Sequence, residues 1–213
     1  MDNFPNDSGR RVVADQAGLN SFLTKMYGNM TLAVLVSALS AYLTMNVFAT
    51  QVLGYFQQHQ GMVWLILLLP IALSMGISFS ATRNPVGGFI MLMLVAIIYG
   101  VEFALIAGAF TAANITAAFI SSAAVFATMA LYGTVTKRDL SKFGAHAMAA
   151  LVALIIASII NIFLKSPAIT YIFSYIAVII FVVLTAWDAQ KMKQIYLNYS
   201  NENSVMGLAI VGA

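Results

Sequence analysis

Two carboxylates that lie in or beside long apolar segments are the side chains best placed to do chemistry in this sequence. Glu102 lies inside one such segment, in the run Tyr99–Phe103, and Asp188 ends another, in Thr185–Asp188. Ionisable groups are expensive inside a membrane and usually serve a function there. Glu102 is therefore either protonated at rest and structurally neutral, or a site for a cation or a proton. Asp188 is either an interfacial carboxylate paired with Lys191, three residues on along the same helix face, or a functional group.

Other chemistry finds little support in the sequence. The chain has no cysteine, which excludes disulfides, a thiol nucleophile and a thiolate metal site. Its two histidines, His59 and His146, are far apart in the sequence and are weak evidence for a metal site. There is no Gly-rich phosphate loop, no His-Glu-x-x-His and no nucleophile elbow. We therefore expect no catalytic residue, no bound metal and no cofactor, and a protein that is not an enzyme.

The composition places these carboxylates in an integral membrane protein. Of 213 residues, 62% are hydrophobic and only 8% are charged, whereas soluble domains carry about 25% charged residues. The apolar runs continue for about 20 residues, the length of a membrane-spanning helix. A transmembrane barrel would show shorter segments of alternating polarity. The sequence therefore predicts an all-α membrane protein.

Six apolar segments have the length of a complete span, and Gly, Asn-Pro or Ser-Pro punctuation separates several of them. We place them at about Met30–Val52, Met62–Ser80, Val86–Phe110, Ala113–Val135, Phe143–Leu164 and Ala168–Trp187. Residues 1–28 are polar and mixed in charge, without the apolar core of a signal peptide. They are predicted to form a cytosolic tail, and residues 29–213 a transmembrane helical bundle.

The basic residues predict the orientation. With the six spans above, nine of the ten Lys and Arg residues fall on one side of the membrane and only Lys165 falls on the other. The nine are Arg10, Arg11, Lys25, Arg83, Lys137, Arg138, Lys142, Lys191 and Lys193. Cytoplasmic loops carry the excess of Lys and Arg, so the N-terminus is predicted to be cytosolic. This scatter of basic residues is typical of membrane topology and gives no reason to expect a nucleic-acid partner.

Several stretches are familiar. Leu131–Gly144 and Ala157–Lys165 resemble the region around the fifth span of the Bax inhibitor-1 family, and Phe181–Lys193 is similar to its sixth span with a characteristic aspartate. Gly18–Leu23 and Met26–Met30 are similar to the bacterial branch of that family. The resemblance covers nearly the whole chain. It implies a multi-pass protein of the bacterial inner, or plasma, membrane whose seven-helix bundle has a central last helix.

The resemblance also implies a function. Bacterial members of this kind are described as pH-sensitive calcium leak channels, in which aspartates on the sixth and seventh helices share a proton and an arginine near the second helix acts as a latch. By its motif, Asp188 is the sixth-helix aspartate, and Arg83 is a candidate for the latch. Glu102 departs from the family pattern and adds an acidic site. Calcium and protons are then the transported and sensed ions, and the lipid bilayer is the surrounding partner.

Two other functions stay open at this point. The protein could be a non-conducting regulator that binds a membrane protease or another membrane protein, as some relatives do. It could also be a proton-coupled exchanger.

The end of the chain bears on the aspartate pair. Met206–Ala213 is similar to the opening of the seventh span. The sequence is thus expected to hold six complete spans and the start of a seventh, with the second aspartate just beyond Ala213. In the chain as written, only Asp188 of the pair is present.

Overall fold

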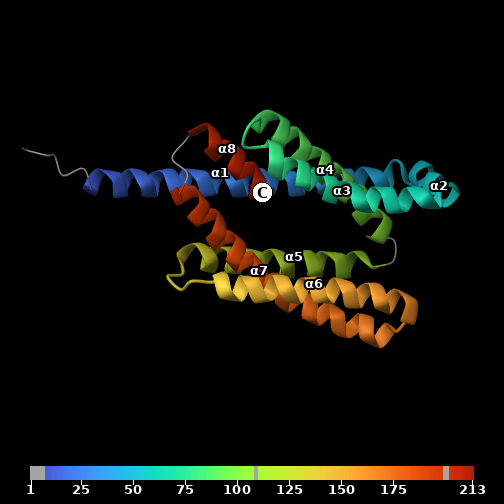
Figure 1. Ribbon diagram of the computed structural model, residues 1–213. Helices are drawn as coiled ribbons and strands as arrows, with labels where there is room; N and C mark the ends of the chain where they lie inside the picture. Colours follow the sequence, from blue (N-terminus) through green and yellow to red (C-terminus); the bar gives the residue numbers. More distant parts are fainter. Residues whose placement is uncertain (1–7, 108–109, 199–201) are drawn as a thin grey trace, which may run out of the picture. The chain divides into compact units, whose positions relative to one another are not determined.

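The computed structural model describes residues 8–107, 110–198 and 202–213, and every regular element in these ranges is an α-helix (Figure 1). The helices are α1 (Ser8–Asn46), α2 (Ala49–Gln58), α3 (Gln60–Ser80), α4 (Pro85–Ala107), α5 (Ala112–Val135), α6 (Ser141–Leu164), α7 (Pro167–Asn198) and α8 (Glu202–Val211). In the described part of the chain, six helices are long and apolar enough to cross a membrane, namely α1 and α3 to α7. The predicted all-α membrane fold is confirmed.

The chain forms two compact units, which are described separately. The first unit comprises residues Met1–Ile115 and Tyr196–Ala213, and so contains α1 to α4 and α8. The second comprises Thr116–Ile195, and so contains most of α5, all of α6 and most of α7.

In the first unit, α1 and α4 run side by side in the same direction. A Cβ atom added at Gly100 of α4 would lie 2.5 Å from the Ser40 Cβ atom of α1, so glycine permits the close approach of the two backbones. The Ser40 hydroxyl donates a hydrogen bond of 2.8 Å across this contact to the Ile97 carbonyl. Farther along both helices, Thr44 and Ala104 line one cavity. Small residues and hydroxyl groups of this kind hold helices together in lipid, where no hydrophobic effect does so.

The last helix packs into the same unit. In Figure 1, α8 lies beside α1 and α4, and it also contacts α3. Its Ile210 is 1% exposed and belongs to a core cluster with Ile77, Ala81, Leu92 and Val95. Gly207, in the middle of α8, meets the α3–α4 turn, and Ala213, just past the end of α8, lines a cavity with Leu92 and Ala96 from the middle of α4. Helices α1, α4 and α8 therefore run in the same direction.

The first predicted span, Met30–Val52, is wrong at its end. Helix α1 stops at Asn46, and the chain resumes as the short helix α2, which the sequence analysis did not predict. The Asn46 amide nitrogen donates to the Tyr42 carbonyl at 2.9 Å, and the Val47 and Phe48 N–H groups both reach the Leu43 carbonyl. This sharing of the last carbonyls ends the helix inside an apolar stretch. Helix α1 also begins at Ser8, within the predicted tail, while residues 1–7 of that tail lie outside the described residues.

The second unit is built on packing of α6 against α7. Ala147 of α6 and Ile180 and Leu184 of α7 form its buried cluster, with Leu151 and Trp187 packed against it. The connection between the two helices is only two residues long, Lys165 and Ser166. So short a connection makes α6 and α7 antiparallel neighbours.

Candidate functional site

Asp188 lies near the end of the apolar part of α7, on the helix face that the second unit leaves exposed. Its neighbours in the sequence point the other way, since Leu184, Ala186 and Ala189 are all buried. The carboxylate is therefore held at the surface of this unit by residues that are anchored beneath it.

Two glycines fix the rotation of α7 at this point. A Cβ atom at Gly133 of α5 would overlap the Ala186 carbonyl group, and its distance to the Ala186 carbonyl carbon would be 2.8 Å. A Cβ atom at Gly144 of α6 would lie 2.6 Å from Cδ1 of the Trp187 ring. The two residues that precede Asp188 are thus each fitted against a glycine. Because such contacts tolerate little rotation, they determine the direction of the Asp188 side chain.

The residues that follow Asp188 bind the connection between α5 and α6. The Gln190 side chain is buried, its oxygen accepts a hydrogen bond of 2.8 Å from the Leu140 N–H group, and its nitrogen donates one of 2.8 Å to the Arg138 carbonyl. The Lys193 ammonium donates a hydrogen bond of 2.7 Å to the Thr134 carbonyl in the last turn of α5. We call these three hydrogen bonds the loop clamp. It ties the helix that carries Asp188 to residues 134–140.

Lys191 interacts with the Trp187 ring and with the charge of Asp188. Its ammonium group lies over the Trp187 ring, 5.0 Å from the ring centroid, a cation–π contact. Among the residues that the structure describes, no ion pair joins Lys191 to Asp188. The ammonium group is nevertheless close enough to act electrostatically on the Asp188 carboxylate, so both interpretations of Asp188 stay open.

A third carboxylate, Asp139, has a local role in the same loop. Its Oδ1 atom accepts a hydrogen bond of 2.9 Å from the Ser141 N–H group at the start of α6. Hydrogen bonds from Ser141, helped by the nearby Lys142 ammonium, lower the pKa of the exposed Asp139 carboxyl. Asp139 is therefore an ordinary ionised carboxylate one residue before Leu140, the N-cap of α6, where a negative charge is favourable.

Glu102 lies in the first unit and is buried in α4. Its side chain is 8% exposed, and its Oε1 atom is buried without a hydrogen-bond partner. Along the parallel pair α1–α4, Glu102 lies between the level of Ser40 and that of Thr44. The unpaired oxygen is compatible with both interpretations of this residue, a protonated structural group and a site for a proton or cation.

Arg83 lies in the turn between α3 and α4, and its side chain is exposed. The residue before it, Thr82, meets α8, because a Cβ atom at Gly207 would lie 2.5 Å from the Thr82 Cα atom. Helix α4 begins two residues after Arg83, at Pro85, and Glu102 follows 17 residues later, about 25 Å along the helix axis. The structure therefore keeps Arg83 apart from Glu102 and places it beside the last helix.

Several residues of this site were missed in the sequence. The structure places Arg83 and Glu102 in the first unit and Asp188 in the second, and around Asp188 it brings together Gly133 and Gln190. The sequence offers only one indication of a role for Gln190, namely a polar side chain in a helix that continues past the apolar segment. Over the described ranges, no three His, Asp or Glu side chains converge in a way that could hold a metal ion.

Six apolar helices with internal glycine and hydroxyl contacts define the class of this protein, a multi-pass α-helical membrane protein. Residues 19–211 match the family model described as inhibitor of apoptosis-promoting Bax1. The chain belongs to the Bax inhibitor-1 family.

Individual relatives agree. The whole chain is 34% identical to the inner membrane protein YbhL of Escherichia coli, and the alignment covers 91% of that protein. It is 33% identical to RP147 of Rickettsia prowazekii, with 92% of this chain and 82% of that protein aligned. It is also 33% identical to YrjE of Lactococcus lactis, with 93% and 86% aligned. Together with the six apolar helices, the likeness to YbhL supports a multi-pass protein of a bacterial inner membrane.

Proposed function

We propose that the protein is a pH-sensitive leak channel for calcium or similar cations in the bacterial inner membrane, with its N-terminus in the cytosol. Membership of the Bax inhibitor-1 family supports the class of function. The observation that carries the proposal is the placement of Asp188. It is an exposed carboxylate at the end of an apolar helix, and its direction is set by two glycine contacts.

Protonation of Asp188 would change the charge at one fixed point of α7. An ionised carboxylate attracts cations and repels a second carboxylate, whereas a neutral one donates a hydrogen bond and can share its proton with that partner. In the proposal, the partner is the aspartate that the family places on the seventh helix. The loop clamp offers a mechanical path, because any tilt of α7 pulls on residues 134–140 through Gln190 and Lys193.

Arg83 is proposed as the latch. Its guanidinium is exposed and lies one residue beyond Thr82, where the α3–α4 turn meets Gly207 of α8. An arginine at that turn can pair with a carboxylate in one state of the channel and release it in the other, because guanidinium groups bind carboxylates in a bidentate geometry. Glu102 is proposed as an intramembrane acidic site that a proton or a cation can occupy.

Calcium flux into liposomes tests this proposal. The full chain is reconstituted with a calcium-sensitive dye inside the vesicles, and uptake is measured at pH 6 and pH 8. We expect uptake above that of empty vesicles, a different rate at the two pH values, and a rate that needs no opposing proton gradient.

The matched control is a carboxylate whose side chain takes part in none of the three hydrogen bonds of the loop clamp. Asp139→Asn removes an exposed charge from the α5–α6 loop and should keep the pH dependence, whereas Asp188→Asn should abolish it. Flux no greater than in empty vesicles, together with a membrane protein that co-purifies in stoichiometric amount, would favour the non-conducting regulator. Flux that requires an opposing proton gradient would favour an exchanger.

A further inference from the structure

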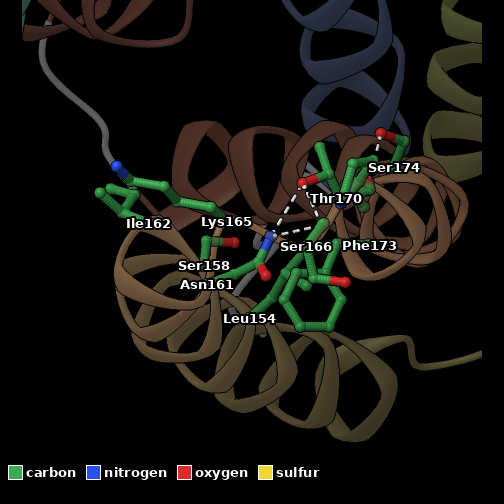
Figure 2. A pocket seen from close by; sticks show the side chains of 11 residues that line it. Leu154, Ser158, Asn161, Ile162, Lys165, Ser166, Thr170, Phe173 and Ser174 are labelled. Carbon is green, nitrogen blue, oxygen red and sulfur yellow. Dashed lines mark hydrogen bonds between the residues drawn. The ribbon is translucent and has the colours of Figure 1, made fainter.

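The second unit contains a pocket at the turn between α6 and α7 that the proposed function does not use (Figure 2). Its volume is about 630 Å³, within the range of about 300–1,000 Å³ that is typical of small-molecule sites. Polar side chains from the turn and from both helices line one part of it, including Asn161, Thr170 and Ser174. Leu154 and Phe173 supply apolar wall.

Asn161 leaves a hydrogen-bond acceptor without a partner in this pocket. The side chain is 7% exposed, and its nitrogen donates to the Thr170 hydroxyl at 2.8 Å and to the Ser166 carbonyl at 3.2 Å. Its Oδ1 atom is buried and has no donor. Figure 2 shows the nitrogen engaged with the turn and the oxygen on its other side, among the lining side chains. A buried acceptor in this state is costly, so a ligand that brings a donor would be stabilised here.

Lys165 supplies the positive charge of the pocket and adopts an unusual backbone conformation. Its φ is 51°, and it is the only non-glycine residue with a positive φ in the described part of the chain. Helices usually place Gly or Asn at such a position, because a Cβ atom is strained there. In Figure 2 the Lys165 side chain extends from the turn toward Ile162, on the side away from Thr170. The residues that line the pocket include this one cation and no carboxylate.

The arrangement fits an amphiphile. The pocket opens at one end of a pair of membrane-spanning helices, with a cation and hydroxyl groups at the turn and apolar side chains along the helices. A lysine ammonium binds phosphate as a point charge, and aliphatic and aromatic walls accept an acyl chain. An ion without an apolar part would leave that wall unused.

We propose that this pocket binds a membrane phospholipid, with the phosphate on the Lys165 ammonium, a headgroup O–H or N–H donor on the Asn161 Oδ1 atom, and the start of an acyl chain beside Leu154 and Phe173. Phosphatidylglycerol offers both a net negative charge and hydroxyl donors. Phosphatidylethanolamine offers donors but no net charge, and phosphatidylcholine has no headgroup donor. The expected order of binding follows from these groups and does not depend on the calcium leak.

Native mass spectrometry of the full chain tests the proposal. The protein is purified in mild detergent and supplied with the three lipids in equal amounts. We expect most retention for phosphatidylglycerol, less for phosphatidylethanolamine and least for phosphatidylcholine. Equal retention of all three lipids by the wild type, or retention of none, would overturn the assignment.

Lys165→Gly is the informative variant. Glycine removes the ammonium group and also relieves the strained backbone, so the fold should be kept and the melting temperature unchanged or raised. Retention of phosphatidylglycerol should fall about tenfold, the effect of losing one charge-assisted contact. Lys142→Ala, which removes a cation near the opposite end of α6, should keep retention at the wild-type level.

Three further outcomes decide the lipid assignment. Ala177→Phe fills the pocket from its α7 wall and should also lower retention. Retention in Lys165→Gly equal to that of the wild type would overturn the role of the cation. Displacement of the lipid by soluble glycerol phosphate at equal concentration would show that the pocket recognises a phosphate ester alone, and would overturn the role of the acyl chain.

Discussion

Substitution of Gly133 by alanine should destabilise the protein strongly, although alanine is the better helix former. The added methyl group would overlap the Ala186 carbonyl group and lie 2.8 Å from its carbonyl carbon, whereas real Cβ contacts essentially never fall under 3.0 Å. The obstacle is backbone, so no side-chain rotation can relieve it, and α5 and α7 must move apart. Overpacking of this kind costs about 1–3 kcal/mol.

The control is the same substitution where space is open. Nothing lies within 4 Å of a Cβ atom at Gly54 of α2, so Gly54→Ala should stabilise its helix by about 0.5–1 kcal/mol. Gly144→Ala should lie between the two, because the atoms that it meets belong to the Trp187 side chain and not to the backbone. The predicted order of stability is Gly54→Ala, then wild type, then Gly144→Ala, then Gly133→Ala.

Thermal unfolding in one detergent, followed by tryptophan fluorescence, measures this order. At about 2–4 °C per kcal/mol for a chain of this length, Gly133→Ala should lower the midpoint by several degrees and Gly54→Ala should raise it slightly. A midpoint for Gly133→Ala equal to or above that of Gly54→Ala would refute the close packing of α5 on α7, and with it the fixed direction of Asp188.

Three other predictions concern the loop clamp, the Asp139 carboxylate and the α1–α4 contact. Gln190→Leu removes two hydrogen bonds to the α5–α6 loop and leaves backbone groups unpaired, which should lower the free energy of unfolding by about 1–3 kcal/mol. Trypsin should then cleave after the basic residues of that loop faster than in the wild type. An unchanged cleavage rate would contradict the loop clamp. Because its pKa is lowered in the folded protein, the ionised Asp139 carboxylate stabilises the fold above about pH 3.9, and this stabilisation is lost as the pH falls through the folded-state pKa. The melting temperatures of wild type and Asp139→Asn should therefore converge in acid. Ser40→Ala should cost about 0.5–1.5 kcal/mol of unfolding free energy, and Ser78→Ala, whose hydroxyl bonds only within its own helix, should cost less in the same melting assay.

The fold could be predicted from the sequence because lipid imposes a simple length rule. An apolar run of about 20 residues must be a helix, so four spans were placed within three residues of their helices from hydrophobicity alone, while the sixth, Ala168–Trp187, begins with α7 but stops eleven residues before its end at Asn198. The end of the first span was placed wrongly, because the length rule does not show where a helix ends inside an apolar stretch. Where α1 ends, the Asn46 side chain donates to the Tyr42 carbonyl and the Val47 and Phe48 N–H groups share the Leu43 carbonyl, while Val47 and Phe48 keep the sequence apolar across the break.

The site could be predicted only in part. Asp188 and Glu102 stood out because a carboxylate is rare in an apolar segment, and that argument needs no partner. The role of Gln190 depends on a loop 50 residues earlier in the chain. Nothing in the sequence around Gln190 indicates that this loop and α7 are in contact. Gly133 and Gly144 lie in a stretch that resembles the family. The residues that would clash with a side chain at these two positions, however, are in α7, far away in the sequence.

The pH dependence of calcium flux in Asp188→Asn tests the central claim most directly. An amide keeps the size of the side chain and cannot titrate, so the ratio of the flux at pH 6 to the flux at pH 8 isolates the proton sensor from the pore. We predict a ratio that differs from one in the wild type and equals one in Asp188→Asn. The same ratio in both proteins would contradict the assignment of Asp188 as the proton sensor.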